Sequence, residues 1–461
     1  MFKARMPFRF GVMTVRELER LTIRIEAEDE HGRRTQGTSA DFMVPRWFSK
    51  DEAGTPERDV AALALSAQSA ARRAAQMNPL GATVFAAWRD LEAATFEGLR
   101  TEPDAALVAG FGLALVERAL MDAATRLAGV SFHEALLGNL FAFEPAALLP
   151  ELAGWNFQSS LAARPSQQVR LRHTVGFLDV LAANDLGARV ADGFPECLEE
   201  DIERHGLSAF KLKLSGKPDA DAKRLLDIAH LLVAHVDRSM LRVSMDANEQ
   251  YADLGALADA LESVNASAAG NMLLSRLCFI EQPVPRRLVQ SVAADPALSR
   301  VERFAPLLLD EGDTHTRAFH EAIPAGWRGV SVKPCKGVFR ALLNHGLVQR
   351  SAGRLFLSAE DLTSPPLTSL QQDLSLTASL GLPDTEKNAH HYFRGLDGCS
   401  STERELALRK LPRLFNRTGD CVHLDVHKGL LDLADCDGTG FGGPHVPWDE
   451  LDHECFLECA S

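Results

Sequence analysis

The sequence has 461 residues, 46% of them hydrophobic, and a formal net charge of -14. A chain of this length buries a large core and can contain more than one domain. The acidic balance works against a surface that follows phosphates, and no run of basic and aromatic residues points to nucleic acid. We therefore expect a small-molecule partner and no nucleic acid.

The apolar stretch around Leu107 to Val116 is too short to span a bilayer, and the N-terminus has no apolar signal core. Eight cysteines are present without the spacing of a disulfide framework, which favours a reducing compartment. No membrane association and a cytoplasmic location are the expectations.

Residues 20–42 alternate apolar and polar side chains around a His-Gly turn, which predicts an antiparallel hairpin. Helical periodicity follows near 56–77, 83–99 and 104–128. Residues 1–140 are therefore predicted to form a small sheet packed on helices.

From about residue 169 short β-rich runs alternate with helical stretches, which indicates parallel βαβ units. The runs are "VRLRHTVG", "AFKLKLSG", "LRVSMDANE", "LCFIEQP", "APLLLDEG", "GVSVKPC", "LFLSAEDL" and "KNAHHYFRGL". Eight such repeats match a closed eight-stranded barrel, which we place at residues 165–395.

Beyond residue 395 the chain becomes polar and Gly-rich, so residues 396–461 are predicted to fold back on the N-terminal segment. The predicted class is α/β: a modified (β/α)8-type TIM barrel with an α+β capping domain formed by the N-terminal segment and the C-terminal tail. Cysteines and histidines of the tail offer zinc ligands, but no Cys-x-x-Cys pair accompanies them, and strand alternation explains "VHLDVH" equally well.

Alternation along each run turns one set of side chains toward the barrel axis. The charged and polar residues at or just after the ends of this set are Lys211, Lys213, Asp246, Asn248, Glu281, Asp310, Glu311 and Lys333. The C-terminal ends of barrel strands are where such enzymes build their active sites.

Inward carboxylates on neighbouring strands repel one another unless a cation neutralises them. Oxygen-only ligands of this kind favour Mg²⁺, with Mn²⁺ as an alternative. A lysine beside that cation and beside a second lysine favours its neutral amine, which acts as a general base. Alternation alone treats Lys211 and Lys213 alike.

The motifs "KLK" (211–213), "DAN" (246–248), "EQP" (281–283), "DE" (310–311) and "VKPCKG" (332–337) occur in this order along the chain. Together with the helix "ALVERALMDAATRLAG" and the Gly-rich tail, they resemble the enolase superfamily, in its subgroup related to muconate lactonizing enzymes. The resemblance covers nearly the whole chain.

The resemblance implies that Asp246, Glu281 and Asp310 ligate Mg²⁺ and that Lys213 and Lys333 flank the substrate as acid/base catalysts. By the same resemblance Lys211 tunes Lys213 and touches the substrate carboxylate. The substrate-binding candidates are Asn248, Glu311 and His390. For His390 a structural role competes with substrate contact.

The implied reaction removes the proton α to a carboxylate through an enediolate, giving a racemase, epimerase or cycloisomerase. The alternatives are an acid dehydratase, an o-succinylbenzoate synthase-like lyase, a catalytically silent binding protein or a Schiff-base aldolase. Lys333 on the sixth strand and "SAEDL" on the seventh argue against the His-Asp dyad of mandelate racemase. The resemblance also implies a homo-oligomer.

Two further segments, 6–11 and 44–50, are expected in loops of the cap. Arg9, Arg46 and Trp47 are candidates there either for substrate contact or for surface packing. The segment 176–206, between the first and second barrel runs, is longer than the repeat requires, and the sequence assigns it no role.

Overall fold

The computed structural model describes residues 1–444 except 12, 52, 78–81 and 100. Its centre is a closed barrel of parallel strands, in which each strand pairs with the next and the last pairs with the first. The strands are β5 (Gln168–Val175), β6 (Ala209–Lys213), β7 (Arg242–Asp246), β8 (Leu277–Glu281), β9 (Leu307–Leu309), β10 (Gly329–Val332), β11 (Phe356–Ala359) and β12 (Asp384–Glu386). The predicted barrel is confirmed.

The eighth strand lies earlier than the sequence predicted. β12 is Asp384–Glu386, whereas Ala389–Tyr392 of the predicted run forms the short helix α13. β12 carries no apolar signal because its two acidic side chains are paired inside the protein. Asp384 accepts a hydrogen bond from Arg172, and Glu386 accepts one from Thr174.

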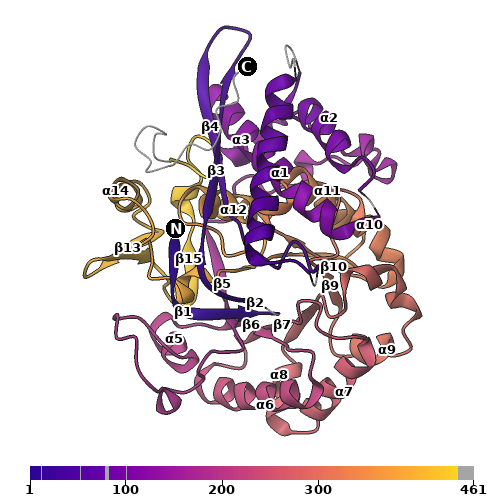
Figure 1. Cartoon of the computed structure of the whole chain (residues 1–461), viewed down its shortest axis with the longest axis vertical. Helices are drawn as coiled ribbons and strands as arrows, with labels where there is room; N and C mark the ends of the chain where they lie inside the picture. The colour runs from indigo at the N-terminus through magenta and orange to yellow at the C-terminus, as the bar shows by residue number, and fades with distance from the viewer. Residues whose placement is uncertain (12, 52, 78–81, 100, 445–461) are drawn as a thin grey trace.

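Helices connect the strands and cover the outside of the barrel, with α6 to α9 on the side away from α1 and α2 (Figure 1). These helices are α5 (Leu198–His205), α6 (Pro218–His235), α7 (Leu254–Asn265), α8 (Ala268–Leu274), α9 (Leu298–Glu302), α10 (Ala318–Ala322), α11 (Val338–Arg350) and α12 (Thr368–Ser379). Among the described residues, no helix combines the length and hydrophobicity needed to cross a membrane.

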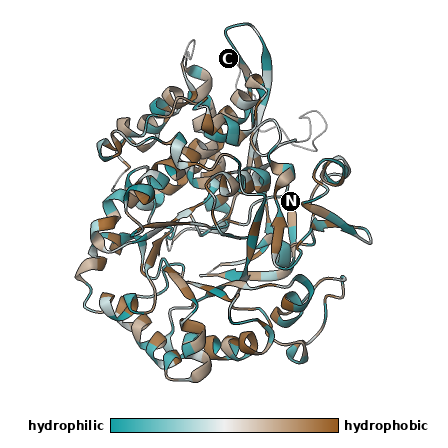
Figure 2. Ribbon diagram, turned by 180° about the vertical axis from the view of Figure 1, so that it is seen from behind, coloured by the Kyte–Doolittle hydropathy of each residue, from teal (hydrophilic) through white to brown (hydrophobic). Residues whose placement is uncertain are grey.

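The N-terminal segment forms the predicted hairpin and helices. Its elements are β1 (Phe2–Phe10), β2 (Met13–Leu18), β3 (Arg20–Glu28), β4 (Arg34–Phe42), α1 (Pro56–Gln76), α2 (Val84–Phe96), α3 (Pro103–Ala128) and α4 (Phe132–Leu137). The expectation of a loop from residue 6 was wrong, because these residues belong to β1 up to Phe10. The tip of the β3–β4 hairpin projects from the body and is hydrophilic (Figure 2).

The C-terminal segment contacts both the cap and the barrel wall. It contains α14 (Ser401–Lys410), β13 (Phe415–Thr418), β14 (Cys421–Leu424) and β15 (Leu430–Asp432), and β15 pairs antiparallel with β5. The Phe441 ring stacks on Phe132 of α4 at 3.9 Å between centroids. The predicted zinc candidates His453, Cys455 and Cys459 lie outside the described residues.

Close packing of α3 on β4 depends on Gly37. A Cβ atom at this position would lie 2.0 Å from the backbone oxygen of Ala119 and 2.5 Å from the nitrogen of Ala123. Both obstacles are main-chain atoms of a helix, which do not move aside as a flexible side chain does. Gly37 therefore sets the distance between the two elements.

We expect Gly37→Ala to lower the free energy of unfolding by about 1–3 kcal/mol, because it overpacks a rigid contact. Urea unfolding measures this change. The matched control is Gly187→Ala, since a Cβ at Gly187 meets nothing within 4 Å. Equal stabilities of the two variants would contradict the packing argument.

Candidate active site

The strand register brings the predicted site residues to one end of the barrel. Lys213 on β6 is the register partner of Asp246 on β7, which is in turn the partner of Glu281 on β8. Glu281 pairs with Leu308, two residues before Asp310. The side chains therefore meet because parallel strands present their C-terminal ends at the same edge of the barrel.

Lys211 lies at the centre of a carboxylate group inside the barrel. Its Nζ is 3.0 Å from Asp246, 2.7 Å from Glu281, and 2.8 Å from both Glu360 and Glu386. Burial alone lowers the pKa of Lys211, but these negative charges outweigh it and raise the pKa well above its usual value. These contacts indicate that the Lys211 ammonium group neutralises the protein's own carboxylates.

Lys213 and Lys333 lie on either side of the three predicted metal ligands. Lys213 Nζ is 2.5 Å from Asp246 Oδ2 and 2.9 Å from Asn248 Oδ1. Lys333 Nζ is 2.6 Å from Asp310 Oδ2. Burial lowers the pKa of Lys333, but the charges of Asp310 and Glu281 outweigh it, so its pKa is raised.

Of the three predicted metal ligands, Glu281 is the one whose carboxylate charge is least compensated by neighbouring residues. Although Lys211 lies close to it, neither of its oxygens accepts a hydrogen bond from the described residues. Burial and the charges of Asp246 and Glu360 raise the pKa of Glu281 well above its usual value. An additional cation between Asp246, Glu281 and Asp310 would remove this cost, so the donor set fits the predicted Mg²⁺.

The ammonium groups of Lys211, Lys213 and Lys333 contact the oxygens of this triad. Among the described residues, several groups have three potential ligand atoms within 4.8 Å of one another, but Asp246, Glu281 and Asp310 do not form such a group. Binding of Mg²⁺ therefore requires these lysines to move away from the carboxylates.

Of the predicted substrate contacts, Asn248 and Glu311 lie in the site. Asn248 Nδ2 donates a hydrogen bond to Glu311 Oε1 at 3.1 Å, and burial raises the pKa of Glu311 to about 7. His390 does not join them. Its Nε2 lies 2.9 Å from His173 Nδ1, in a separate group of histidines. The function proposed below therefore gives His390 no role.

Sequence reasoning missed several charged residues of the site. Glu386 lies on the unpredicted strand β12, and Glu360 was noted without a role. Lys336 Nζ donates to the Asp310 backbone oxygen at 2.5 Å. In the sequence, Lys336 is indicated only as the second lysine of "VKPCKG". No pattern around Glu386 predicts a strand.

Cap residues cover the site. The Trp47 ring is 2% exposed, and Lys333 Nζ lies 4.7 Å from its centroid, a cation–π distance. A Cβ atom at Gly11 would lie 3.7 Å from Cβ of Asn248, so the β1–β2 turn is close to the strand ends. Lys213 is 7% exposed, so the candidate site is buried.

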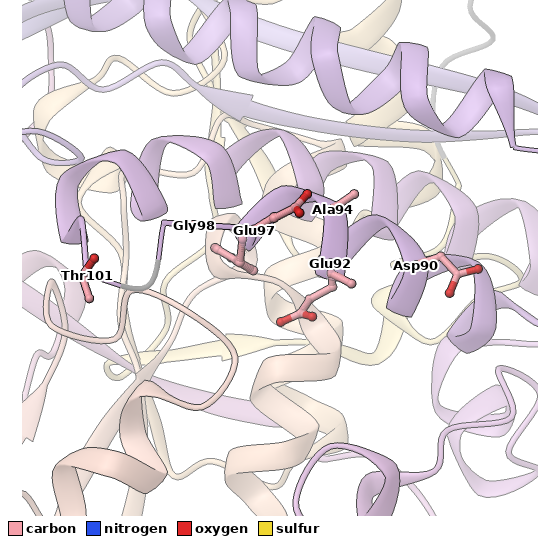
Figure 3. Close-up of a pocket in the computed structure, with 8 residues that line it drawn as sticks. Asp90, Glu92, Ala94, Glu97, Gly98 and Thr101 are labelled. Atoms are coloured by element: carbon pink, nitrogen blue, oxygen red, sulfur yellow. The ribbon is translucent and has the colours of Figure 1, made fainter.

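A hollow of about 750 Å³ lies elsewhere, along α2 in the cap. Its lining contains the carboxylates of Asp90, Glu92 and Glu97, which point in different directions (Figure 3). None of the strand-end residues lines it. We therefore assign the candidate active site to the barrel and not to this hollow.

Comparison with solved structures shows the fold. A dipeptide epimerase from Enterococcus faecalis, complexed with Mg and a dipeptide, matches 96% of each chain with a TM-score of 0.59 and 14% identity. The 2-chloromuconate cycloisomerase from Rhodococcus opacus has a TM-score of 0.59 and 16% identity, covering 96% of this chain and 93% of its own. A mandelate racemase/muconate lactonizing enzyme from Bordetella bronchiseptica has a TM-score of 0.52 and 18% identity, covering 97% and 98%.

A scan against protein-family models and a search of curated proteins find no match. The fold and the strand-end residues define a capped TIM barrel with charged side chains at the C-terminal ends of its strands. Within that class, the similar structures are muconate cycloisomerases, dipeptide epimerases and mandelate racemase-like enzymes. The resemblance inferred from the motifs is confirmed at the level of the fold.

The first turn of α11, which follows Lys333 in the chain, is fixed to the cap by a buried carboxylate. Glu117 of α3 is 1% exposed, and its Oε1 accepts a hydrogen bond from the backbone N–H of Phe339 at 2.6 Å. Burial raises the pKa of Glu117 from 4.5 to about 7. The folded protein therefore retains a proton on Glu117 that the unfolded chain releases at lower pH.

Because the folded pKa of Glu117 is the higher one, its contribution to stability is complete below pH 4.5 and is lost as the pH rises to about 7. We expect the difference in unfolding free energy between the protein and Glu117→Gln to fall by up to about 3 kcal/mol over this range. Urea unfolding at a series of pH values measures the difference. A difference that does not vary with pH would refute the assignment.

Proposed function

We propose that this chain is a Mg²⁺-dependent member of the enolase superfamily that removes the proton α to a substrate carboxylate. The observation that carries the proposal is the placement of Lys213 and Lys333 on opposite sides of Asp246, Glu281 and Asp310. A racemase, epimerase or cycloisomerase is the reaction type that these residues support best.

Two amines on opposite sides of one carbon allow a proton to leave from one face and return to the other. One lysine must be neutral and the other charged at the start of the reaction. Displacement of the Lys333 ammonium group from Asp310 removes the charge that raises the pKa of Lys333. Substrate and metal binding therefore favour the neutral amine that catalysis needs.

Mg²⁺ held by Asp246, Glu281 and Asp310 would supply positive charge beside the substrate carboxylate as negative charge develops on it. The protein's own residues complete the site. Asn248 orients Lys213 by a hydrogen bond at 2.9 Å, and Trp47 excludes water from Lys333. Lys211 balances the negative charge of Glu360 and Glu386, which are not among the proposed metal ligands.

Two of the similar structures support an acid as the substrate. One is an epimerase complexed with a dipeptide, and the other is a 2-chloromuconate cycloisomerase. Both contain a carboxylate, which a cation and two lysines attract. An acid dehydratase or o-succinylbenzoate synthase-like lyase uses the same proton abstraction, and a homo-oligomer in the cytoplasm remains part of the proposal.

We expect the protein to exchange the α-hydrogen of its substrate for deuterium in heavy water, within a panel of acids that includes dipeptides and muconates. Lys213→Ala should slow the exchange by at least about 100-fold, because it removes the base. Nuclear magnetic resonance measures exchange. The control is Lys217→Ala, four residues along the chain and exposed.

Lys333→Ala distinguishes the reaction types. A two-base epimerase should retain exchange from one face but lose formation of the opposite configuration. A protein that binds acids with Mg²⁺ yet never exchanges the hydrogen is a binding protein, which would refute the proposal. Trapping of a carbonyl substrate on lysine by borohydride would instead indicate a Schiff-base aldolase.

We expect Glu281→Gln to weaken Mg²⁺ binding at least about 10-fold, because it removes one of three charged ligands. Calorimetric titration of Mg²⁺ into metal-free protein measures this. Glu405→Gln is the control, since that side chain is 69% exposed. Full exchange activity in the presence of excess chelator would overturn the role of the metal.

A further inference from the structure

A second group of titratable residues lies outside the barrel wall and has no part in the proposed reaction. We call it the histidine cluster: His173, Asp201, His205, His390 and His391. Arg172 and Thr174 turn into the barrel, where they contact Glu360 and Glu386. His173 between them therefore faces outward, toward α5 and α13.

Three elements bring the cluster together. His173 comes from β5, Asp201 and His205 from α5, and His390 and His391 from α13. One ligand atom from each of His173, Asp201 and His391 lies within 4.8 Å of the other two. These three residues are at most 3% exposed.

Two buried atoms of this triad, one on Asp201 and one on His391, face each other at ion-pair distance without a well-aligned hydrogen bond. Asp201 Oδ2 and His391 Nδ1 are only 2.7 Å apart, yet neither has a well-aligned hydrogen-bond partner among the described residues. A buried carboxylate oxygen and a ring nitrogen left in this state cost free energy. A cation bound to both atoms would satisfy them together.

His173 is oriented as a metal ligand would be. Its Nδ1 shares a hydrogen bond with His390 Nε2 at 2.9 Å, which fixes the ring. A small cavity of about 30 Å³, lined in part by His205 and His390, lies beside the cluster and has room for one water molecule.

We propose that His173, Asp201 and His391 bind a divalent transition-metal ion of the Zn²⁺ class, separate from the Mg²⁺ site inside the barrel. Two imidazoles and a carboxylate form a donor set that such ions prefer, whereas Mg²⁺ prefers oxygen alone. Because its ligands come from β5, α5 and α13, the ion ties both helices to the barrel wall. Its role is structural.

A neighbouring group, Asp201 with His205 and His390, shares the same aspartate. His205 Nε2 lies 3.9 Å from Asp201 Oδ1, and the His390 ring is less buried than His391. The triad with His391 also contains both atoms of the unsatisfied contact. We therefore assign the ion to His173, Asp201 and His391.

Titration of the full chain with Co²⁺ in excess Mg²⁺ tests the proposal, because Co²⁺ bound to nitrogen in a low-coordinate site absorbs visible light. We expect one equivalent to bind with such bands and Zn²⁺ to displace it. His391→Gln and Asp201→Asn should weaken binding at least about 10-fold, and Glu281→Gln should leave the bands unchanged.

Thermal unfolding with and without Zn²⁺ provides a second readout, and circular dichroism checks that each variant folds. The ion should raise the melting temperature of the unmodified protein but not that of His391→Gln. Absence of the bands and of thermal stabilisation in the unmodified protein would overturn the proposal. Loss of binding in His205→Gln with retention in His391→Gln would show that the ligand set is wrong.

Discussion

The charge balance of the barrel interior depends on the buried ion pairs of the Lys211 ammonium group. It lies between carboxylates from β7, β8 and β12 and from the residue after β11, so that one cation balances negative charge from opposite parts of the wall. Without it, buried like charges would repel one another across a medium of low dielectric constant. The last strand depends on the same balance, because β12 is short and polar and closes the barrel through paired charges rather than apolar packing.

This charge balance gives the three lysines different environments. Lys211 is surrounded by carboxylates, whereas Lys213 and Lys333, to which we propose to assign proton transfer, lie at the edges of the group. Glu281 still lacks compensation, and burial together with its neighbours raises its pKa. In the function that we propose, a divalent ion would complete the charge balance of the same carboxylates. Stability and the proposed chemistry therefore rest on one electrostatic arrangement.

The cap takes part in the site as well as covering it. Glu117 holds the loop after β10 through the Phe339 backbone, and Trp47 lies on the Lys333 ammonium group. Lys333 is thus positioned from the cap, although its own strand belongs to the barrel. On the opposite side of the wall, the histidine cluster joins α5 and α13 to β5, next to the strand that closes the barrel. Charged and titratable groups therefore fix the first and last strands from inside and outside.

The sequence by itself determined the barrel, the hairpin and helices of the cap, and the inward direction of Lys211, because these follow from local periodicity. It placed Lys213, Asp246, Glu281, Asp310 and Lys333 at strand ends, and the register brings them to one edge. Only the tertiary structure decided that β12 is Asp384–Glu386, that Glu360 and Glu386 share Lys211, and that His390 joins His173. These features depend on pairing between residues distant in the chain, where a polar side chain is buried because its partner is charged, and no local pattern records such a partner.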